Sequence, residues 1–200
     1  EYIPDLDAQF FANLRILRNR AKYRFSVVFS LNRPLEELLE PMLFADFYEF
    51  IADNIIFLPL LDKPGLDFRI SYLEKITGKR INDLLTNQLT KLTGGHGKLT
   101  RIALEAILAT GNWPLATSKK LKEFLLEQKN VKAALYEIWV SLLPEEQKSL
   151  AANQLIASRY LNDVGLTKDP SAGSGQVEVA IPLLEEFIKT IKQSSNKTII

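Results

Sequence analysis

The chain has 200 residues, of which 46% are hydrophobic and 24% charged, the composition of a folded protein with one large or two small domains. Its net charge of +1 excludes binding to nucleic acid or anionic membrane through a global field, so such binding would require a local patch. The absence of cysteine excludes disulfides and thiolate metal sites. Because no apolar run reaches about 18 residues and no secretory leader is recognisable, we expect a cytoplasmic protein with no membrane partner.

The first 62 residues predict a small α/β region. Apolar residues recur at helical intervals over residues 7–22, and a β-branched and aromatic run over residues 23–34 predicts a strand buried on both faces. The next segment is predicted to be helical in two pieces, broken before Pro41, and residues 54–61 predict a second buried strand. Strand, helix and strand at this spacing indicate a partial parallel βαβ unit, which needs further strands that this sequence does not contain.

The remainder of the chain predicts two helical regions. Residues 63–128 show helical periodicity interrupted by breaks at residues 77–78, 94–97 and 111–114, which indicates a small bundle. Residues 129–193 then predict three helices, a glycine-rich turn and a strand, the pattern of a winged helix-turn-helix. The predicted fold class is therefore mainly α with a small α/β part.

A glycine cluster, "TGGHGKLTR" at residues 93–101, holds the only histidine of the chain and superficially looks like a phosphate loop. That loop needs a glycine, four residues, then Gly-Lys-Ser/Thr after a buried strand. If Gly97-Lys98 is aligned with the Gly-Lys of that motif, Leu92 stands in place of the first glycine and Leu99 in place of the Ser/Thr. Residues 81–92, which precede the cluster, have the apolar pattern of a helix and not of a strand. We therefore interpret the cluster as a break between two helices, where glycine adopts backbone angles that other residues resist.

The order of these segments, from "FFANLRILRNRAKYRFSVVFSLNRPLEEL" through "NIIFLPLL" and "LTGGHGKLTRIALEAIL" to "LNDVGL", resembles the C-terminal half of a AAA+-related signal-transducing ATPase of the STAND type. In that family a parallel-sheet nucleotide-binding domain precedes a helical lid with a Gly-Gly-His-Pro-like turn and a winged helix. The resemblance implies the end of a nucleotide-binding α/β domain at residues 1–62, a helical lid at 63–128, a winged helix domain at 129–193 and a frayed tail at 194–200.

The family carries its phosphate loop and Walker B strand upstream of the region that this chain resembles. The resemblance therefore implies a fragment whose partner is the missing N-terminal nucleotide-binding part, and whose parent binds ATP or ADP with Mg²⁺. We expect this chain alone to be non-catalytic and to bind no cofactor. Glu1 is similar to the glutamate after the Walker B aspartate, and an ordinary exposed acid is the alternative for it.

Candidate nucleotide contacts follow from the same resemblance. Arg33 stands where the family places a phosphate-sensing residue at the end of a strand, and a guanidinium there offers paired donors to a phosphate. An ion pair with Glu36 or Glu37 is the alternative, and Asn32 either assists or ends the strand. In the lid, the resemblance implies contacts from the glycine turn and the helix that follows it: Gly94, Gly95, His96, Gly97 and Arg101.

Some features of the lid weaken this prediction. Gly97 replaces the proline of the family, which puts an adenine contact in doubt. Lys98 and Arg101 lie in a first helical turn, where cations are unfavourable unless they face an anion. His96 has no second histidine or cysteine to complete a transition-metal site, so we predict no metal site and interpret it as a turn residue at a helix start.

Two other functions stay open. A DNA-binding regulator would read bases with Asn153 and Gln154 of the winged helix and hold phosphates with Arg159 and Lys168, although this is a small basic set for DNA. A helical protein-interaction module is the third possibility. We favour a winged helix that packs on its own ATPase core, on a protein partner or on a second copy.

Overall fold

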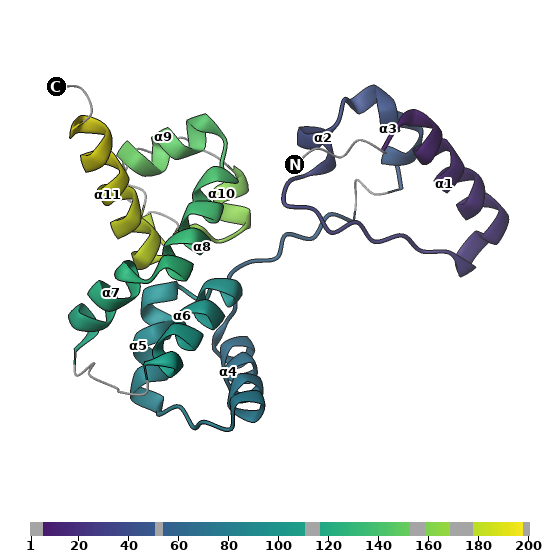
Figure 1. Cartoon of the computed structure of the whole chain (residues 1–200). Helices are drawn as coiled ribbons and strands as arrows, with labels where there is room; N and C mark the ends of the chain where they lie inside the picture. The colour runs from purple at the N-terminus through teal and green to yellow at the C-terminus, as the bar shows by residue number, and fades with distance from the viewer. Residues whose placement is uncertain (1–5, 51–53, 111–116, 153–158, 169–177, 198–200) are drawn as a thin grey trace. The chain divides into compact units, whose positions relative to one another are not determined.

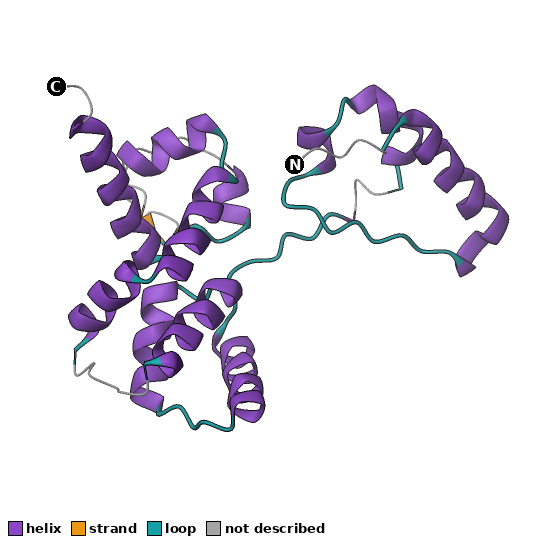
Figure 2. Cartoon of the chain, viewed as in Figure 1, coloured by secondary structure: helices purple, strands orange, loops and turns teal. Residues whose placement is uncertain are grey.

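The computed structural model describes residues 6–50, 54–110, 117–152, 159–168 and 178–197 (Figure 1). The chain divides into two compact units, Glu1–Phe57 (unit 1) and Leu58–Ile200 (unit 2). Most described residues are helical, and the sheet among them has two short antiparallel strands (Figure 2). The predicted fold class, mainly α with a small part that contains strands, is confirmed at this level.

Unit 1 is built around phenylalanines. Its helices are α1 (Ala8–Ala21), the 3-10 helix η1 (Lys22–Arg24), α2 (Leu35–Leu38) and α3 (Pro41–Tyr48). Asp7 caps α1 by accepting the backbone N–H of Phe10 at 2.8 Å, and Pro41 opens α3, where a missing N–H costs nothing. The ring of Phe11 packs 5.7 Å from Phe44 and 6.0 Å from Phe47, and all three side chains are buried.

The predicted parallel βαβ unit is wrong in this structure. Residues 25–31 and 55–61 form no strand. The one sheet found among the described residues is made by β1 (Thr167–Lys168) and β2 (Glu178–Val179) of unit 2. Residues 25–30 do alternate between half-buried and exposed side chains, as a strand does, and Phe29 packs on the aromatic core. The physical reason is pairing: two lone parallel strands leave both outer edges and much apolar surface uncovered.

Unit 2 is helical throughout most of its length. Its elements are α4 (Lys63–Thr77), α5 (Asp83–Thr93), α6 (Gly97–Ala109), α7 (Ser118–Glu127), α8 (Lys129–Val140), α9 (Pro144–Ala152), α10 (Arg159–Asp163), β1 (Thr167–Lys168), β2 (Glu178–Val179) and α11 (Pro182–Lys197). The predicted breaks at residues 77–78 and 94–97 are confirmed, because Gly78 and Gly94 end α4 and α5 in left-handed conformations. The third predicted break, at residues 111–114, lies outside the described residues.

One hydrophobic core joins the predicted lid to the predicted winged helix. Leu89 and Leu104 of the former and Leu135 and Leu184 of the latter are fully buried members of the same cluster. In the last part of unit 2, helices α8, α9 and α10 are followed by β1, which pairs antiparallel with β2. Helix α11 continues to Lys197, into the predicted tail.

Candidate functional site

The glycine turn, residues 93–97, lies between α5 and α6 and packs against two other segments of unit 2. Gly94 and Gly95 have φ angles of 60° and 88°. A Cβ atom on Gly94 would lie 2.3 Å from the carbonyl oxygen of Ala180, and one on Gly95 would lie 2.4 Å from that of Leu61. Both positions therefore require glycine for two reasons: the backbone has a positive φ angle, and another backbone segment leaves no room for a Cβ atom. Since the turn follows a helix, the rejection of a phosphate loop is confirmed.

A backbone hydrogen bond fastens the turn to the segment that precedes α4. The N–H of Leu61 donates to the carbonyl oxygen of Gly95 at 2.9 Å, and Gly95 itself is buried. On the other side, Ala180 joins β2 to α11. The turn thus connects the entry of the predicted lid with the end of the predicted wing.

His96 is the N-cap of α6, as its interpretation at a helix start predicted. Its Nδ1 accepts the backbone N–H of Leu99 at 3.2 Å, which requires a neutral ring with its proton on Nε2. Burial lowers the pKa of His96 from its usual 6.5, and the nearby charge of Lys98 acts in the same direction. The backbone hydrogen bond of His96 and the carboxylate of Glu137 oppose this shift.

Beneath the turn lies a buried pair of threonines that sequence reasoning missed. Thr93 and Thr100 are fully buried, and their hydroxyl oxygens lie 2.8 Å apart. Thr93 donates its proton to the carbonyl oxygen of Leu89 at 2.9 Å, so Thr100 is the donor within the pair. The available signal was that both threonines fall on the apolar faces of their helices, at positions where leucine is the rule.

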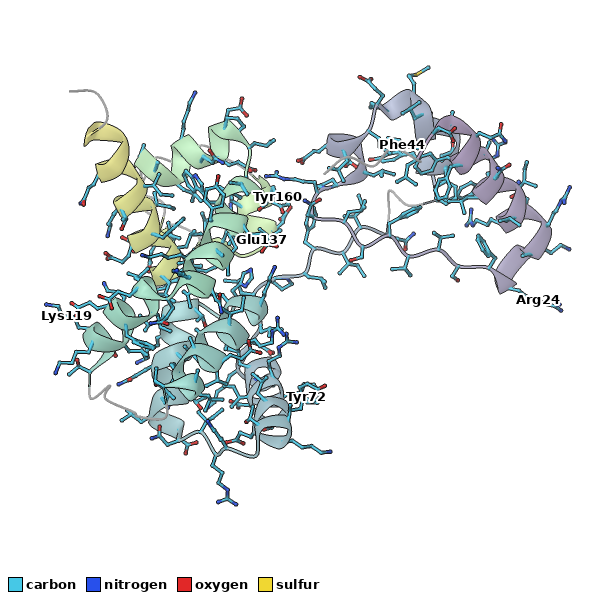
Figure 3. All side chains as sticks on the ribbon, viewed as in Figure 1. Arg24, Phe44, Tyr72, Lys119, Glu137 and Tyr160 are labelled. Carbon is cyan, nitrogen blue, oxygen red and sulfur yellow. The ribbon has the colours of Figure 1, made fainter. Side chains whose placement is uncertain are left out.

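The cations near the turn already have acidic partners. Lys98 of α6 forms an ion pair with Glu137 of α8 at 2.6 Å, and the side chain of Glu137, labelled in Figure 3, is exposed. Arg101 lies 3.8 Å from Glu105, one turn further along α6. A phosphate near this helix end would therefore compete with carboxylates for both cations. Gly97 is the first residue of α6, with only the flexible end of Leu61 near its missing Cβ.

The two candidates of unit 1 differ in exposure. Arg33 is 7% exposed, and its Nη1 lies 3.1 Å from Oε2 of Glu37, while Asn32 is exposed. The predicted alternative for Arg33, an ion pair with the following helix, is thus present, although it is buried on the arginine side. Arg33 and Asn32 belong to unit 1, whereas the glycine turn belongs to unit 2.

A scan of protein-family models and searches of curated proteins and of solved structures found no match to this chain.

The candidates for DNA binding are only partly described. Asn153 and Gln154 lie outside the described residues, as does the side chain of Arg159, whose backbone opens α10. Lys168 of β1 forms an ion pair with Glu178 of β2, across the ladder. The one wing cation that can be assessed is therefore neutralised by its own hairpin.

Two other kinds of feature are absent from the described residues. No group of three or more histidine, aspartate and glutamate side chains there is arranged to hold a metal ion. Among the helices in the same residues, none combines the length and the apolar character needed to cross a membrane.

Proposed function

We propose that this chain is the C-terminal part of a STAND-type signal-transducing ATPase, in which unit 2 relays the nucleotide state of its parent to a protein partner. The observation that carries the proposal is the position of the glycine turn. The turn contacts Leu61, at the entry of the predicted lid, and Ala180, at the end of the predicted wing. A displacement of the turn would press on both segments, because closely packed backbones have no free space to absorb it.

A second feature supports a parent with a larger sheet. Val28 is 91% exposed and Ile56 is 82% exposed, although both lie in apolar runs typical of strands. Within the described residues, no backbone hydrogen bond joins residues 25–31 to another segment. Further strands of a nucleotide-binding domain would pair with these backbones and cover these side chains.

The relay also has a path toward the predicted winged helix. The Thr93–Thr100 pair fixes α5 against α6 beneath the turn, and the Lys98–Glu137 ion pair joins α6 to α8. A shift of the N-terminus of α6 would therefore also move α8, the first helix of the predicted winged helix. Interhelical movement of this kind is a common form of switching between two packed states.

The packing around the glycine turn limits which of its residues a nucleotide could contact. The Cα atoms of Gly94 and Gly95 face the carbonyl oxygens of Ala180 and Leu61, so packing accounts for both glycines. His96 and Gly97 at the start of α6 are half-buried, and Lys98 beside them is exposed. ATP or ADP with Mg²⁺, held mainly by the phosphate loop of the parent, would supply the change in charge that drives the relay.

Nucleotide binding tests the proposal. The full-length protein that contains this chain should bind fluorescent ADP in a Mg²⁺-dependent manner, whereas the chain of 200 residues should bind it at least 100-fold more weakly. The relay predicts that nucleotide alters protease cleavage within unit 2 of the full-length protein. A full-length protein that binds no nucleotide, or an isolated chain that hydrolyses ATP at about 1 s⁻¹ or faster, would exclude the proposed role.

A protein-interaction module is the second candidate, and α4 favours it. Phe68, Tyr72 and Ile76 recur at every fourth residue of this helix, and all three are exposed, Phe68 by 76%. Such an apolar stripe is typical of a surface that another protein covers. Capture of a partner that depends on Phe68 and is indifferent to nucleotide would favour this function over the ATPase.

The DNA-binding regulator has less support, because Lys168 is paired with Glu178. A mobility shift on DNA that weakens with salt and disappears in an Arg159→Ala variant would nevertheless establish it. The same shift retained in that variant would place any nucleic-acid binding elsewhere in the chain.

A further inference from the structure

The C-terminal end of α1 gathers basic side chains that no nearby acid in the sequence balances. From Ala8 to Leu35 the chain has six arginines and lysines and no aspartate or glutamate. Arg20, Lys22 and Arg24, which we call the basic corner, are all exposed. Among the described residues, no ion pair includes any of the three. Arg24 lies at the far end of η1, away from Phe44 and the aromatic core (Figure 3).

The helix dipole accounts for only part of this cluster. Arg18 and Arg20 lie in the last turn of α1, where a cation is favoured by the partial negative charge of the helix end. That attraction fades within one turn, and Lys22 and Arg24 follow the end of the helix. Arg18 is otherwise engaged, with its guanidinium 3.6 Å from the centre of the Phe50 ring. The three remaining cations alternate along residues 20–24, with no acid between them in the sequence.

The backbone at the corner is strained. Lys22 has a φ angle of 53°, and it is the one non-glycine residue with positive φ among those the structure describes. This conformation costs about 1 to 3 kcal/mol for a residue with a side chain, and residues held in this way cluster at ligand-binding sites. A glycine would adopt the same conformation without strain, so the lysine side chain is the exception that needs an explanation.

We propose that the basic corner binds the sugar–phosphate backbone of nucleic acid, without reading its sequence. Two guanidinium groups supply paired donors that match phosphate oxygens, and Lys22 adds a point charge between them in the sequence. This interaction is separate from the proposed relay, because it lies in unit 1 and requires no nucleotide.

Two other anionic partners fit the corner less well. Stable anchoring to a lipid surface needs an apolar helix face in addition to basic residues, and on α1 this face, Phe10, Phe11 and Leu14, already packs on the aromatic core. An acidic protein needs an apolar centre to its interface, and Ile16 and Leu17 supply only two partly exposed aliphatic side chains. A phosphate backbone needs neither, since release of its counterions drives the binding.

Fluorescence anisotropy with the full chain tests the proposal. Labelled single-stranded and duplex oligonucleotides of about 20 nucleotides should bind with a Kd of about 1 to 100 μM. About three neutralised phosphates give a slope of log K on log salt of about −2.7 for the duplex and about −2.1 for the single strand. The variant Arg20→Ala/Lys22→Gly/Arg24→Ala should weaken binding at least tenfold and bring the slope toward zero. Glycine replaces Lys22 because it tolerates the positive φ, so the variant should keep its fold, as circular dichroism would verify.

A charge-matched control separates a site from general attraction. The variant Lys119→Ala/Lys120→Ala/Lys129→Ala removes three exposed charges from α7 and α8, and it should change the Kd by less than about threefold. The variant Arg20→Lys/Arg24→Lys should keep most of the binding, since the charges remain. Equal losses in the two alanine series, no binding to either oligonucleotide, or binding to phosphatidylserine vesicles alone would each overturn the proposal.

Discussion

At the scale of single residues, the fold requires glycine at position 95. Its φ angle of 88° and the 2.4 Å approach of the Leu61 carbonyl oxygen to a Cβ predict that Gly95→Ala loses about 2 to 4 kcal/mol of unfolding free energy. Gly78 is the matched control, because it has a φ of 67° and no atom within 4 Å of its Cβ position. Gly78→Ala should therefore lose only about 1 kcal/mol. Urea unfolding compares the two, and equal losses would contradict the close packing of the turn.

Also at this scale, His96 makes the stability of unit 2 depend on pH. Its pKa in the folded state lies below 6.5, chiefly because of burial, so the unfolded chain binds the proton more readily. The stabilising contribution is fully present above pH 6.5 and is lost as the pH falls through the lower, folded-state pKa. Protonation also removes the acceptor that caps Leu99, which adds to the loss.

His96→Asn isolates this effect, because asparagine caps a helix without titrating. The variant should match the original chain in urea unfolding near pH 7.5 and exceed it near pH 5. The comparison cancels the titration of all other groups. A constant difference between the two chains over this range would show that His96 does not contribute the pH dependence.

At the scale of elements, α6 begins in a way that accepts the proline of the resembled family. Gly97 is its first residue, where the backbone N–H has no partner within the helix, and the preceding His96 is extended, as a residue before proline should be. Gly97→Pro should therefore raise the unfolding free energy by about 0.4 to 1 kcal/mol, through lower entropy of the unfolded chain. Thermal unfolding measures this. A loss larger than about 1 kcal/mol would mean that Leu61, 3.1 Å from the Cβ position, cannot move aside.

Elements with local signals were predictable, whereas those that depend on distant partners were not. The start of α1 at Asp7, the break before Pro41 and the glycine end of α5 each arise from a capping or breaking residue within one turn of the boundary. The predicted strand at residues 23–34 had the right composition, but a strand exists only when another segment pairs with it. The Thr93–Thr100 pair escaped prediction because it depends on how two helices pack.

At the scale of the whole molecule, the two units differ in how much of their surface they bury. Unit 2 has an apolar core that runs from α4 to α11, whereas the buried core found among the described residues of unit 1 is four side chains, Phe11, Leu35, Phe44 and Phe47. A chain of about 60 residues is marginal even when its surface is well covered. Because Val28 and Ile56 are exposed, the apolar surface of unit 1 is not well covered, and we expect unit 1 to be less stable still.

The separated units should therefore behave differently. Residues 58–200 should unfold cooperatively in urea and give dispersed amide signals in NMR, because the fragment keeps its entire core. Residues 1–57 should show a broad, non-cooperative transition and should aggregate through their apolar, unpaired segments. Replacing the exposed Val28 and Ile56 with threonine should reduce that aggregation, since threonine keeps the β-branched shape but exposes a hydroxyl group. A cooperative transition of the isolated residues 1–57 would mean that the four buried side chains of unit 1 are enough to stabilise its fold. Unit 1 would then need no further strands.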